Sequence, residues 1–357
     1  MLAAIFYGGQ EIQVEERPVP EPGPGEVLVR VKSAGICGSD LHGYRGHSPF
    51  TQRNDAPRIG RENGHELAGE VAAVGAGVTG LGIGQRVGIE PEHLIGCGTC
   101  EYCRRGDSHI CPRRGVRGNE RHGSHGFSQY DVCRATNVHP LPESVSDDAA
   151  AILDCYACGV HSVRRVRIKP DSRVVILGTG AIGMTLGQVA KASGARQVIM
   201  VGTREEPLAI AREAGAADVG IAHATTDPIA AVRDLTNGVG VDAVFETVGS
   251  TAPTLDQAIH MARPGGTVCI LGIYTYRPEL DVRTAYAKEL TITWANSYSS
   301  WNGRSEYEIA LDLLAAGRLR AEPIITHHYP LRQIGEAFAA AENKKASGAV
   351  KVMVHPG

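Results

Sequence analysis

Short apolar runs separated by glycine and proline fill residues 1–150 of the chain. The run Val27–Val31 alternates apolar and polar positions after the cluster Pro18–Gly25, while Glu70–Val74 and Gln85–Ile89 are brief apolar stretches near glycines. Runs of this length between turn-forming residues are typical of β-strands. The pattern therefore predicts a β-rich region at this end of the chain.

From residue 151 onward, longer helical periods alternate with apolar strands. We predict helices over Ala149–Arg167, Ala181–Ser193 and Pro207–Ala214, and buried strands over Arg173–Leu177, Gln197–Val201, Ala243–Glu246 and Thr267–Leu271. Strands and helices that alternate in this way form βαβ units, in which a parallel sheet carries helices on both faces. We therefore expect an α/β fold with a doubly wound parallel sheet.

The last part of the chain returns to a mixed pattern. Amphipathic helices are predicted over Ser305–Ala316 and Leu331–Glu342, followed by a strand over Ala349–Val354. The βαβ block thus lies between a β-rich region and a C-terminal piece that we expect to return to that region. We predict one domain from residues 1–152 and 296–357, and a second from residues 153–295.

Composition narrows the classes of function. A chain of 357 residues is long enough for two domains, and its net charge of −3 argues against nucleic acid or an anionic membrane as a partner. No apolar run reaches the roughly 20 residues that span a bilayer, and the first residues lack the basic segment of a signal peptide. Nine cysteines without an export signal indicate a reducing cytoplasm, where clustered cysteines bind metal more often than they form disulfides.

The cysteines include one dense run, Cys97, Cys100, Cys103 and Cys111. Three of them are spaced by two residues, and a loop of a few residues brings back the fourth. This spacing suits four thiolates around one zinc ion at about 2.3 Å each. Since four cysteine ligands leave zinc no open position, we predict a structural zinc here and look for catalysis elsewhere.

A glycine-rich turn follows the predicted strand that ends at Leu177. Its sequence, Gly178-Thr179-Gly180-Ala181-Ile182-Gly183, opens a predicted helix. The first glycine suits the tight turn, the second lets the backbone approach a pyrophosphate, and the third permits close packing of helix on strand. Helix N-terminal N–H groups then favour the anion. The context predicts dinucleotide binding.

The second strand of this block ends without the acid that usually holds the ribose of NAD. Gly202, Thr203 and Arg204 occupy the expected place. A 2′-phosphate needs room, a cationic partner and no repelling carboxylate, which favours NADP(H) over NAD(H). The alternative is that Arg204 lies on a solvated turn and that Glu205 or Glu206 binds the ribose.

A second metal site is indicated by Cys37, in the segment Gly35–His42, and by His65. Either residue alone is weak, because lone cysteines and histidines are usually structural. Beside a predicted dinucleotide site they suggest two ligands of an open zinc site. Hydride transfer from an alcohol requires loss of the hydroxyl proton, for which zinc supplies the Lewis acidity.

At this point the chain resembles the zinc-dependent medium-chain alcohol dehydrogenases, in their sorbitol or polyol dehydrogenase branch. The resemblance covers nearly the whole chain. It rests on the segment Gly35–His42, the pattern Gly64-His65-Glu66-x2-Gly69-x5-Gly75-x2-Val78, the four-cysteine run, Gly126–Tyr130 and the turn Gly178–Gly183. It implies a GroES-like β-rich catalytic domain and a Rossmann domain, with two zinc ions per chain.

The resemblance also implies roles for single residues. Cys37 and His65 would be ligands of the catalytic zinc. Glu66 would be the acid beside the metal, and Asp40 would orient His65. Ser39 would hydrogen-bond the substrate oxygen, and His42 would pass its proton to solvent.

The third protein ligand of this zinc stays open. Sorbitol dehydrogenases carry glutamate at this position, seven residues before a histidine, and here Asp154 precedes His161 by that spacing. We place Asp154 at the ligand position. Cys155 is the rival, Cys158 fits less well, and a third possibility is that Asp154 reaches zinc only through water.

The expected function is a zinc-dependent oxidoreductase that transfers a hydride between NADP(H) and a secondary alcohol or ketone. Polyols, cyclitols and hydroxy acids are the favoured substrates. Simple secondary alcohols, or an NAD-preferring polyol dehydrogenase, are the alternatives. A zinc-free quinone reductase would lack the four-cysteine run, and a non-catalytic zinc module leaves Cys37 and His65 unexplained. The resemblance implies a homodimer or homotetramer, with no nucleic-acid or membrane partner.

Overall fold

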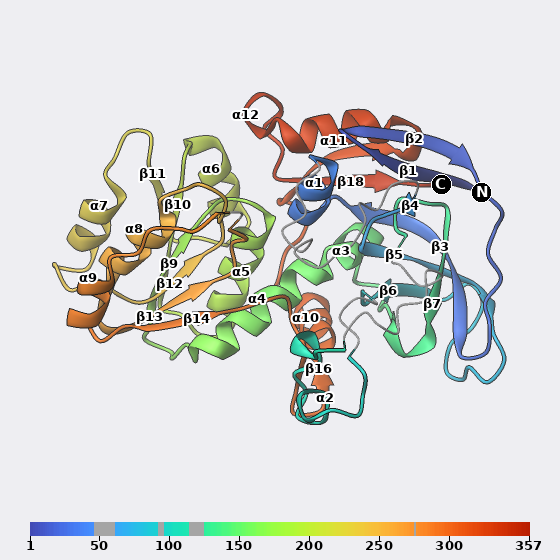
Figure 1. Cartoon of the computed structure of the whole chain (residues 1–357), viewed down its shortest axis with the longest axis horizontal. Coiled ribbons are helices and arrows are strands. Elements are labelled where there is room, and N and C mark those ends of the chain that lie inside the picture. Colours follow the sequence, from blue (N-terminus) through green and yellow to red (C-terminus); the bar gives the residue numbers. More distant parts are fainter. Residues whose placement is uncertain (46–60, 92–95, 114–124, 275) are drawn as a thin grey trace. The chain divides into compact units, whose positions relative to one another are not determined.

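The computed structural model describes residues 1–45, 61–91, 96–113, 125–274 and 276–357. The chain folds as two compact units (Figure 1). The first contains Met1–Asp154, Ser299–Ala315 and Ile325–Gly357, and the second contains Cys155–Tyr298 and Ala316–Ile324. The second unit thus includes residues 296–298 and 316–324, which we assigned to the first domain, whereas residues 153 and 154 fall in the first unit. Among the described residues, no helix is long and apolar enough to cross a membrane.

The first unit is built mainly of strands. Its strands are β1 (Leu2–Gly8), β2 (Glu11–Glu16), β3 (Glu26–Gly35), β4 (Arg61–Glu62), β5 (Glu66–Val74), β6 (Arg86–Ile89), β7 (Tyr130–Arg134), β8 (Val138–Pro140), β15 (Ser300–Trp301), β16 (Arg304–Ser305), β17 (Ile325–Pro330) and β18 (Lys351–His355). Its α-helices are α1 (Gly38–Tyr44), α2 (Glu101–Arg104), α3 (Asp147–Ala151), α10 (Glu306–Ala315), α11 (Ile334–Glu342) and α12 (Lys344–Ser347). The 3-10 turns are η2 (Ser108–Ile110), η3 (Ala135–Asn137) and η4 (Leu331–Gln333).

A seven-stranded sheet forms the centre of the first unit. Its order is β17-β18-β3-β5-β6-β8, with β7 paired to β3, and a smaller sheet has the order β2-β1-β4. Alternating residues of β3, among them Val27, Val29 and Val31, are fully buried in the core. The rings of Phe6 and Phe127 both pack edge-on against Phe338 of α11, with centroids 5.4 and 5.6 Å away. The core thus joins the start and the end of the chain, as the interrupted sequence pattern predicted.

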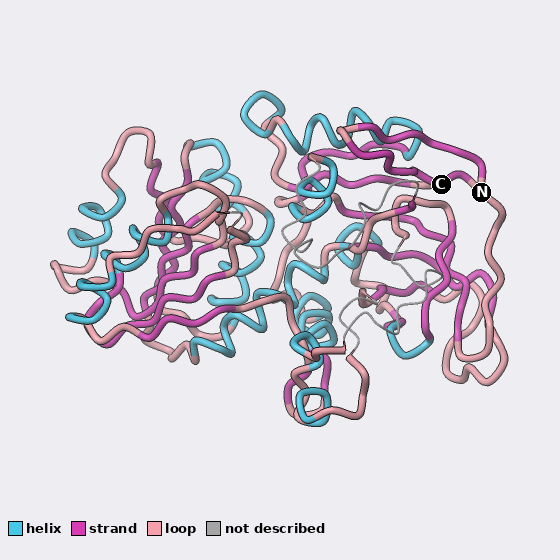
Figure 2. The backbone as a smooth tube through the Cα atoms, viewed as in Figure 1, coloured by secondary structure: helices cyan, strands magenta, loops and turns pink. Residues whose placement is uncertain are grey.

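The second unit is a parallel sheet with helices, as expected. Its strands are β9 (Arg173–Leu177), β10 (Gln197–Gly202), β11 (Val219–Ala222), β12 (Val241–Glu246), β13 (Ala262–Ile270) and β14 (Thr291–Trp294). They form a six-stranded sheet in the order β11-β10-β9-β12-β13-β14, and every pair is parallel. Figure 2 shows these strands in magenta, with the helices of the unit in cyan beside them. The helices are α4 (Leu153–Val166), α5 (Ala181–Ala192), α6 (Glu205–Glu213), α7 (Pro228–Leu235), α8 (Thr254–Met261) and α9 (Val282–Ala287).

The single helix predicted over Ala149–Arg167 is wrong. α3 begins after Ser146, whose hydroxyl accepts a hydrogen bond from the N–H of Ala149 at 3.2 Å. It ends at Ala151 because Ile152 leaves the helical region, and α4 then begins at Leu153. The break places Asp154 in the first turn of a new helix. Apolar periodicity alone did not reveal this break, because Ile152 and Leu153 are both fully buried.

Candidate active site and metal centres

The start of α1 brings three predicted site residues together. Cys37 precedes the helix, and its backbone N–H donates to Asp40 Oδ2 at 2.9 Å. Asp40 Oδ1 lies 3.5 Å from Nδ1 of His65. One carboxylate therefore holds the backbone of Cys37 and contacts the ring of His65.

The ligand atoms of Cys37, His65 and Glu66 all lie within 4.8 Å of one another. His65 and Glu66 stand at the start of β5, where Glu66 pairs with Gly35 of β3. A Cβ at Gly35 would lie 2.2 Å from Glu66 Oε2, so glycine at this position makes room for the carboxylate. One thiol, one imidazole and one carboxylate form a donor set that suits catalytic zinc.

Glu66 also has a partner that sequence reasoning missed. Its fully buried carboxylate pairs with the Lys351 ammonium, which is only 2% exposed and also donates to the Ile36 carbonyl at 3.2 Å. We predicted the region of Lys351 only as a strand. A lysine in such a strand is expected to face solvent, and the neighbouring residues do not indicate whether it is exposed or buried.

The charges of this group act on His65. Burial lowers the pKa of His65, but the negative charges of Asp40 and Cys37 outweigh burial and hold this pKa well above its usual value. A metal cation and a proton compete for the same imidazole lone pair. The same acidic surroundings that favour the proton thus favour a metal ion.

The other predicted residues of this centre lie on nearby elements. Ser39 and His42 are three positions apart on α1, so they share one side of the helix. Asp154 is 7% exposed, and its carboxylate is not within 4.8 Å of all three ligand atoms of Cys37, His65 and Glu66. Buried Tyr307 has its pKa raised by burial first and then by carboxylates that include Asp154 and Glu66, so both acids act on the same interior.

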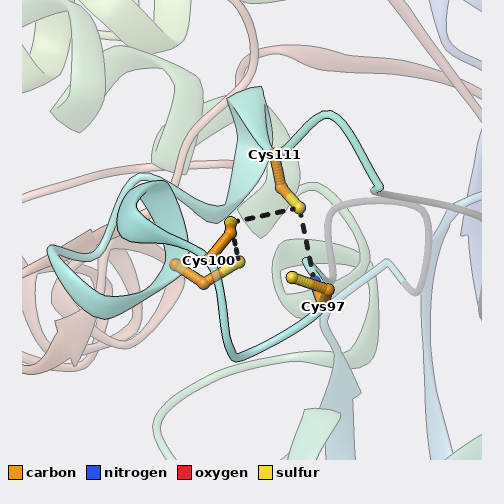
Figure 3. Close-up of side chains that lie close together, drawn as sticks. Cys97, Cys100 and Cys111 are labelled. Carbon is orange, nitrogen blue, oxygen red and sulfur yellow. Dashed lines mark hydrogen bonds between the residues drawn. The ribbon is translucent and has the colours of Figure 1, made fainter.

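The four-cysteine run also forms a cluster, as predicted. The sulfurs of Cys97, Cys100, Cys103 and Cys111 lie within 4.8 Å of one another, and Figure 3 shows three of them turned toward a common centre. Cys100 Sγ is 3.5 Å from Cys103 Sγ and 3.6 Å from Cys111 Sγ. Tetrahedral thiolates at about 2.3 Å from one zinc are about 3.8 Å apart. The cluster therefore fits a closed zinc site, and none of the nine cysteines, all of which lie in the described part of the chain, forms a disulfide.

Hydrogen bonds favour the deprotonated form of two cysteines in this cluster. Bonds from Thr99 lower the pKa of Cys97 to about 5, and the backbone N–H of Cys97 lowers that of Cys111. Burial instead raises the pKa of Cys103 to about 12. A coordinated metal removes the proton from such a thiol, so the raised value does not argue against zinc.

The glycine turn contains two glycines that its backbone and packing require, and a third, Gly180, with open space beside it. Gly178 has φ +116°, and a Cβ at Gly183 would lie 2.1 Å from the Gly178 carbonyl oxygen. A Cβ at Gly180 would meet no atom within 4 Å. The turn requires glycine at position 178 because of its positive φ, and packing requires glycine at position 183. The space beside Gly180 is open and could admit a ligand. Thr179, Ala181 and Ile182 complete the turn and the start of α5.

The end of β10 lacks a carboxylate, as the sequence indicated. Gly202 closes the strand, exposed Thr203 follows, and Arg204 is the cap of α6. A Cβ at Gly202 would lie 2.5 Å from Cγ2 of Thr179. Glu205 pairs with Arg212 within the helix.

Family models of known proteins match residues of both units. A family model described as an alcohol dehydrogenase GroES-like domain matches residues 23–143, and one described as a zinc-binding dehydrogenase matches residues 181–316. A sorbitol dehydrogenase of Halalkalibacterium halodurans is 34% identical, with 99% of this chain and 98% of the relative covered.

Solved structures share the fold over their full length. An Escherichia coli oxidoreductase of unknown specificity has a TM-score of 0.89 at 31% identity, covering 99% of this chain and 98% of its own. A zinc-binding dehydrogenase of Sinorhizobium meliloti, bound to NADP, has a TM-score of 0.84 at 29% identity, covering 99% of each chain.

Proposed function

The chain belongs to the zinc-dependent medium-chain alcohol dehydrogenases, in the branch that contains the sorbitol dehydrogenases, and we propose that it oxidises or forms a secondary alcohol with NADP(H). The observation that carries this proposal is the group of Cys37, His65 and Glu66 beside Asp40. The favoured substrates are polyols, cyclitols and hydroxy acids. The chain would act in the cytoplasm as a homodimer or homotetramer.

The proposed function requires two zinc sites, one catalytic and one structural, and one nicotinamide site. Cys37 and His65 would hold the catalytic zinc, and Cys97, Cys100, Cys103 and Cys111 the structural one. When bound, zinc supplies Lewis acidity toward the alcohol oxygen, and the nicotinamide accepts or donates the hydride. The turn Gly178–Gly183 would bind the pyrophosphate, since its backbone is free to approach at Gly180.

The protein's own residues handle the proton. The Ser39 hydroxyl hydrogen-bonds the substrate oxygen, and during oxidation it receives the substrate proton while releasing its own toward His42. His42, three residues later on α1, passes that proton to solvent. Asp40 keeps Cys37 and His65 in place throughout.

The test of this function is a panel of polyols, cyclitols and secondary alcohols, assayed with NADP+ and with NAD+. We expect turnover that depends on zinc and is lost in Cys37→Ala. Turnover of small secondary alcohols only would indicate a simple secondary alcohol dehydrogenase. Turnover with NAD+ only would indicate an NAD-preferring polyol dehydrogenase. If two zinc ions are bound and no member of the panel reduces either nicotinamide, the proposal is wrong.

The third zinc ligand needs its own test. We propose Asp154, with Glu66 as its competitor because Glu66 lies closer to the other two. Asp154→Asn should lower the zinc content by one per chain. Glu66→Gln is best combined with Lys351→Met, which removes the buried ammonium that would otherwise lose its partner. Loss of zinc only in the double variant would assign Glu66 instead.

The preference for NADP(H) is proposed from Gly202 and Arg204. A carboxylate at position 202 requires Thr179 to move, so the informative variant is Gly202→Asp with Thr179→Ala and Arg204→Ala. The matched control carries only Thr179→Ala and Arg204→Ala. We expect the control to lose preference for NADP+ and the triple variant to favour NAD+. Unchanged selectivity in both would contradict the assignment.

A further inference from the structure

Another group of metal-ligand side chains lies in the first unit and shares no residue with the two centres above. Asp148 is in the first turn of α3, His328 is on β17 and His355 ends β18. Their ligand atoms all lie within 4.8 Å of one another. These residues come from three separate parts of the chain, so the fold alone brings them together.

The strand pairing places the two histidines side by side. β17 and β18 are parallel, and His328 lies opposite Met353, two residues before His355. Since alternate residues of a strand face the same side, His328 and His355 share one face of the sheet. Their rings stack with centroids 5.4 Å apart and an interplanar angle of 17°.

The distances between the donor atoms suit one metal ion. His328 Nδ1 is 3.1 Å from His355 Nε2 and 3.5 Å from Asp148 Oδ2, and His355 Nε2 is 3.7 Å from Asp148 Oδ1. The two nitrogens, which are within hydrogen-bond distance of each other, would subtend an angle of about 95° at a metal about 2.1 Å from each. Each nitrogen lies near a different oxygen of Asp148, so this carboxylate can bind the same ion through one oxygen or both.

Neighbouring groups hold two of the three ligands in orientation. His355 Nδ1 lies 3.2 Å from the carbonyl oxygen of Lys32, which can only accept, so Nδ1 carries the proton. In the neutral ring Nε2 then presents its lone pair to the cluster. Asp148 Oδ1 accepts a hydrogen bond from the Ser33 hydroxyl at 2.5 Å. Supporting bonds of this kind are usual behind histidine and carboxylate ligands of metals.

We propose that Asp148, His328 and His355 form a zinc site with three protein ligands and one position left for water. Two imidazoles and one carboxylate favour zinc and related transition metals over magnesium or calcium, which prefer oxygen donors. The His328 side chain is 51% exposed, so the ion can enter from solvent and a fourth ligand has room. Bound zinc ties β17 and the end of β18 to α3.

The experiment is a zinc titration of protein whose two other sites are already filled, followed by calorimetry and by thermal unfolding. Wild type should bind one further Zn2+ per chain and none of the Mg2+ used as a comparison. Its unfolding midpoint should rise with zinc concentration. His328→Ala should weaken the added binding at least tenfold and abolish the rise, and Asp148→Asn should do the same.

The matched control is His327→Ala. This neighbouring histidine contacts Thr326 and Tyr329 and is not part of the cluster. It should leave the added zinc equivalent unchanged. The proposal is overturned if wild type binds no further zinc, or if His328→Ala binds it as wild type does. Dehydrogenase activity should be the same in all these variants, so this outcome is independent of the proposed function.

Discussion

At the scale of single residues, two glycines of the glycine turn have different roles: Gly183 is required by packing, and Gly180 is proposed to leave room for the cofactor. A methyl at Gly183 collides with a backbone carbonyl, whereas a methyl at Gly180 meets only open space. We predict that Gly183→Ala lowers the free energy of unfolding by about 1–3 kcal/mol, since rigid backbone must shift. Gly180→Ala should keep wild-type stability.

The same pair of variants should differ in cofactor binding. Gly180→Ala places its methyl where the pyrophosphate would approach, so KM for NADP+ should rise about tenfold or more. Urea unfolding and initial-rate kinetics on both variants measure the contrast. A normal KM in Gly180→Ala would show that the diphosphate binds elsewhere.

Asp40 carries a second prediction at this scale. Its carboxylate accepts a hydrogen bond from the Cys37 backbone and contacts His65, so Asp40→Asn removes a negative charge next to both proposed zinc ligands. We expect the affinity of the catalytic zinc to fall about tenfold to a hundredfold, with the four-cysteine zinc retained. Zinc content after dialysis against a chelator measures this. The control is Asp312→Asn, which breaks only an exposed pair with Arg304.

At the scale of elements, we expect the four-cysteine lobe to depend on the zinc ion proposed for it. α2 and η2 have four and three residues, too few to be stable alone. The lobe is held to the rest of the first unit by bonds such as Ser108 N–H to Ser299 Oγ at 3.0 Å. Cys103→Ser should therefore remove one zinc and loosen this lobe.

Limited proteolysis is the measurement for the lobe. Arg104 and Arg105 are exposed trypsin sites within it. Cys103→Ser should be cut there faster than wild type, while the catalytic zinc stays bound. Cys133→Ser, at a buried cysteine outside the cluster, is the control. Equal cleavage rates in wild type and Cys103→Ser would contradict a structural zinc.

Asp242 of β12 links the neighbouring strands β9 and β13 of the second unit. Because its carboxylate is charged, we predict that its contribution to stability depends on pH. Asp242 Oδ2 accepts from the Arg173 N–H of β9, and Oδ1 accepts from Arg263 Nε of β13, both at 2.8 Å. Burial raises the pKa of Asp242, but these two donors outweigh it and the pKa is lowered. A lowered carboxyl pKa adds stability above its ordinary value near 3.9, and this stability is lost as the pH falls through the lowered pKa.

We therefore expect Asp242→Asn to be about 1 kcal/mol less stable than wild type at pH 7, a small value because both partners are partly exposed. The difference should shrink as the pH falls from 4 toward 2. Chemical unfolding of both proteins across this range is the measurement. A difference that does not change with pH would exclude the charge as its source.

At the scale of the whole molecule, the two units should respond to different ligands. Hydrogen exchange should slow at residues 178–183 and 203–206 when NADP+ is added. Removal of zinc should instead speed exchange at residues 97–111. Protection by NADP+ that is confined to other segments would contradict the proposed cofactor site.

Local patterns predicted much of this molecule, and the two failures have different causes. Strands such as Arg173–Leu177 and the four-cysteine cluster are as predicted, because periodicity and ligand spacing act over a few residues. The helix break at Ile152 was missed because buried apolar residues continue through it. Residues 316–324 were misplaced because their partners, including Gln188 bonded to Arg320, are remote in sequence.

The sequence by itself determined the family, the glycine turn and the four-cysteine cluster, since these depend on residue type at short spacing. Only the tertiary structure decided which remote residues meet. It paired Lys351 with Glu66 and joined Asp148 to His328 and His355. The physical reason is that a lysine or histidine on a strand has the same local pattern whether it faces solvent or a buried charge. Packing of distant segments decides between the two.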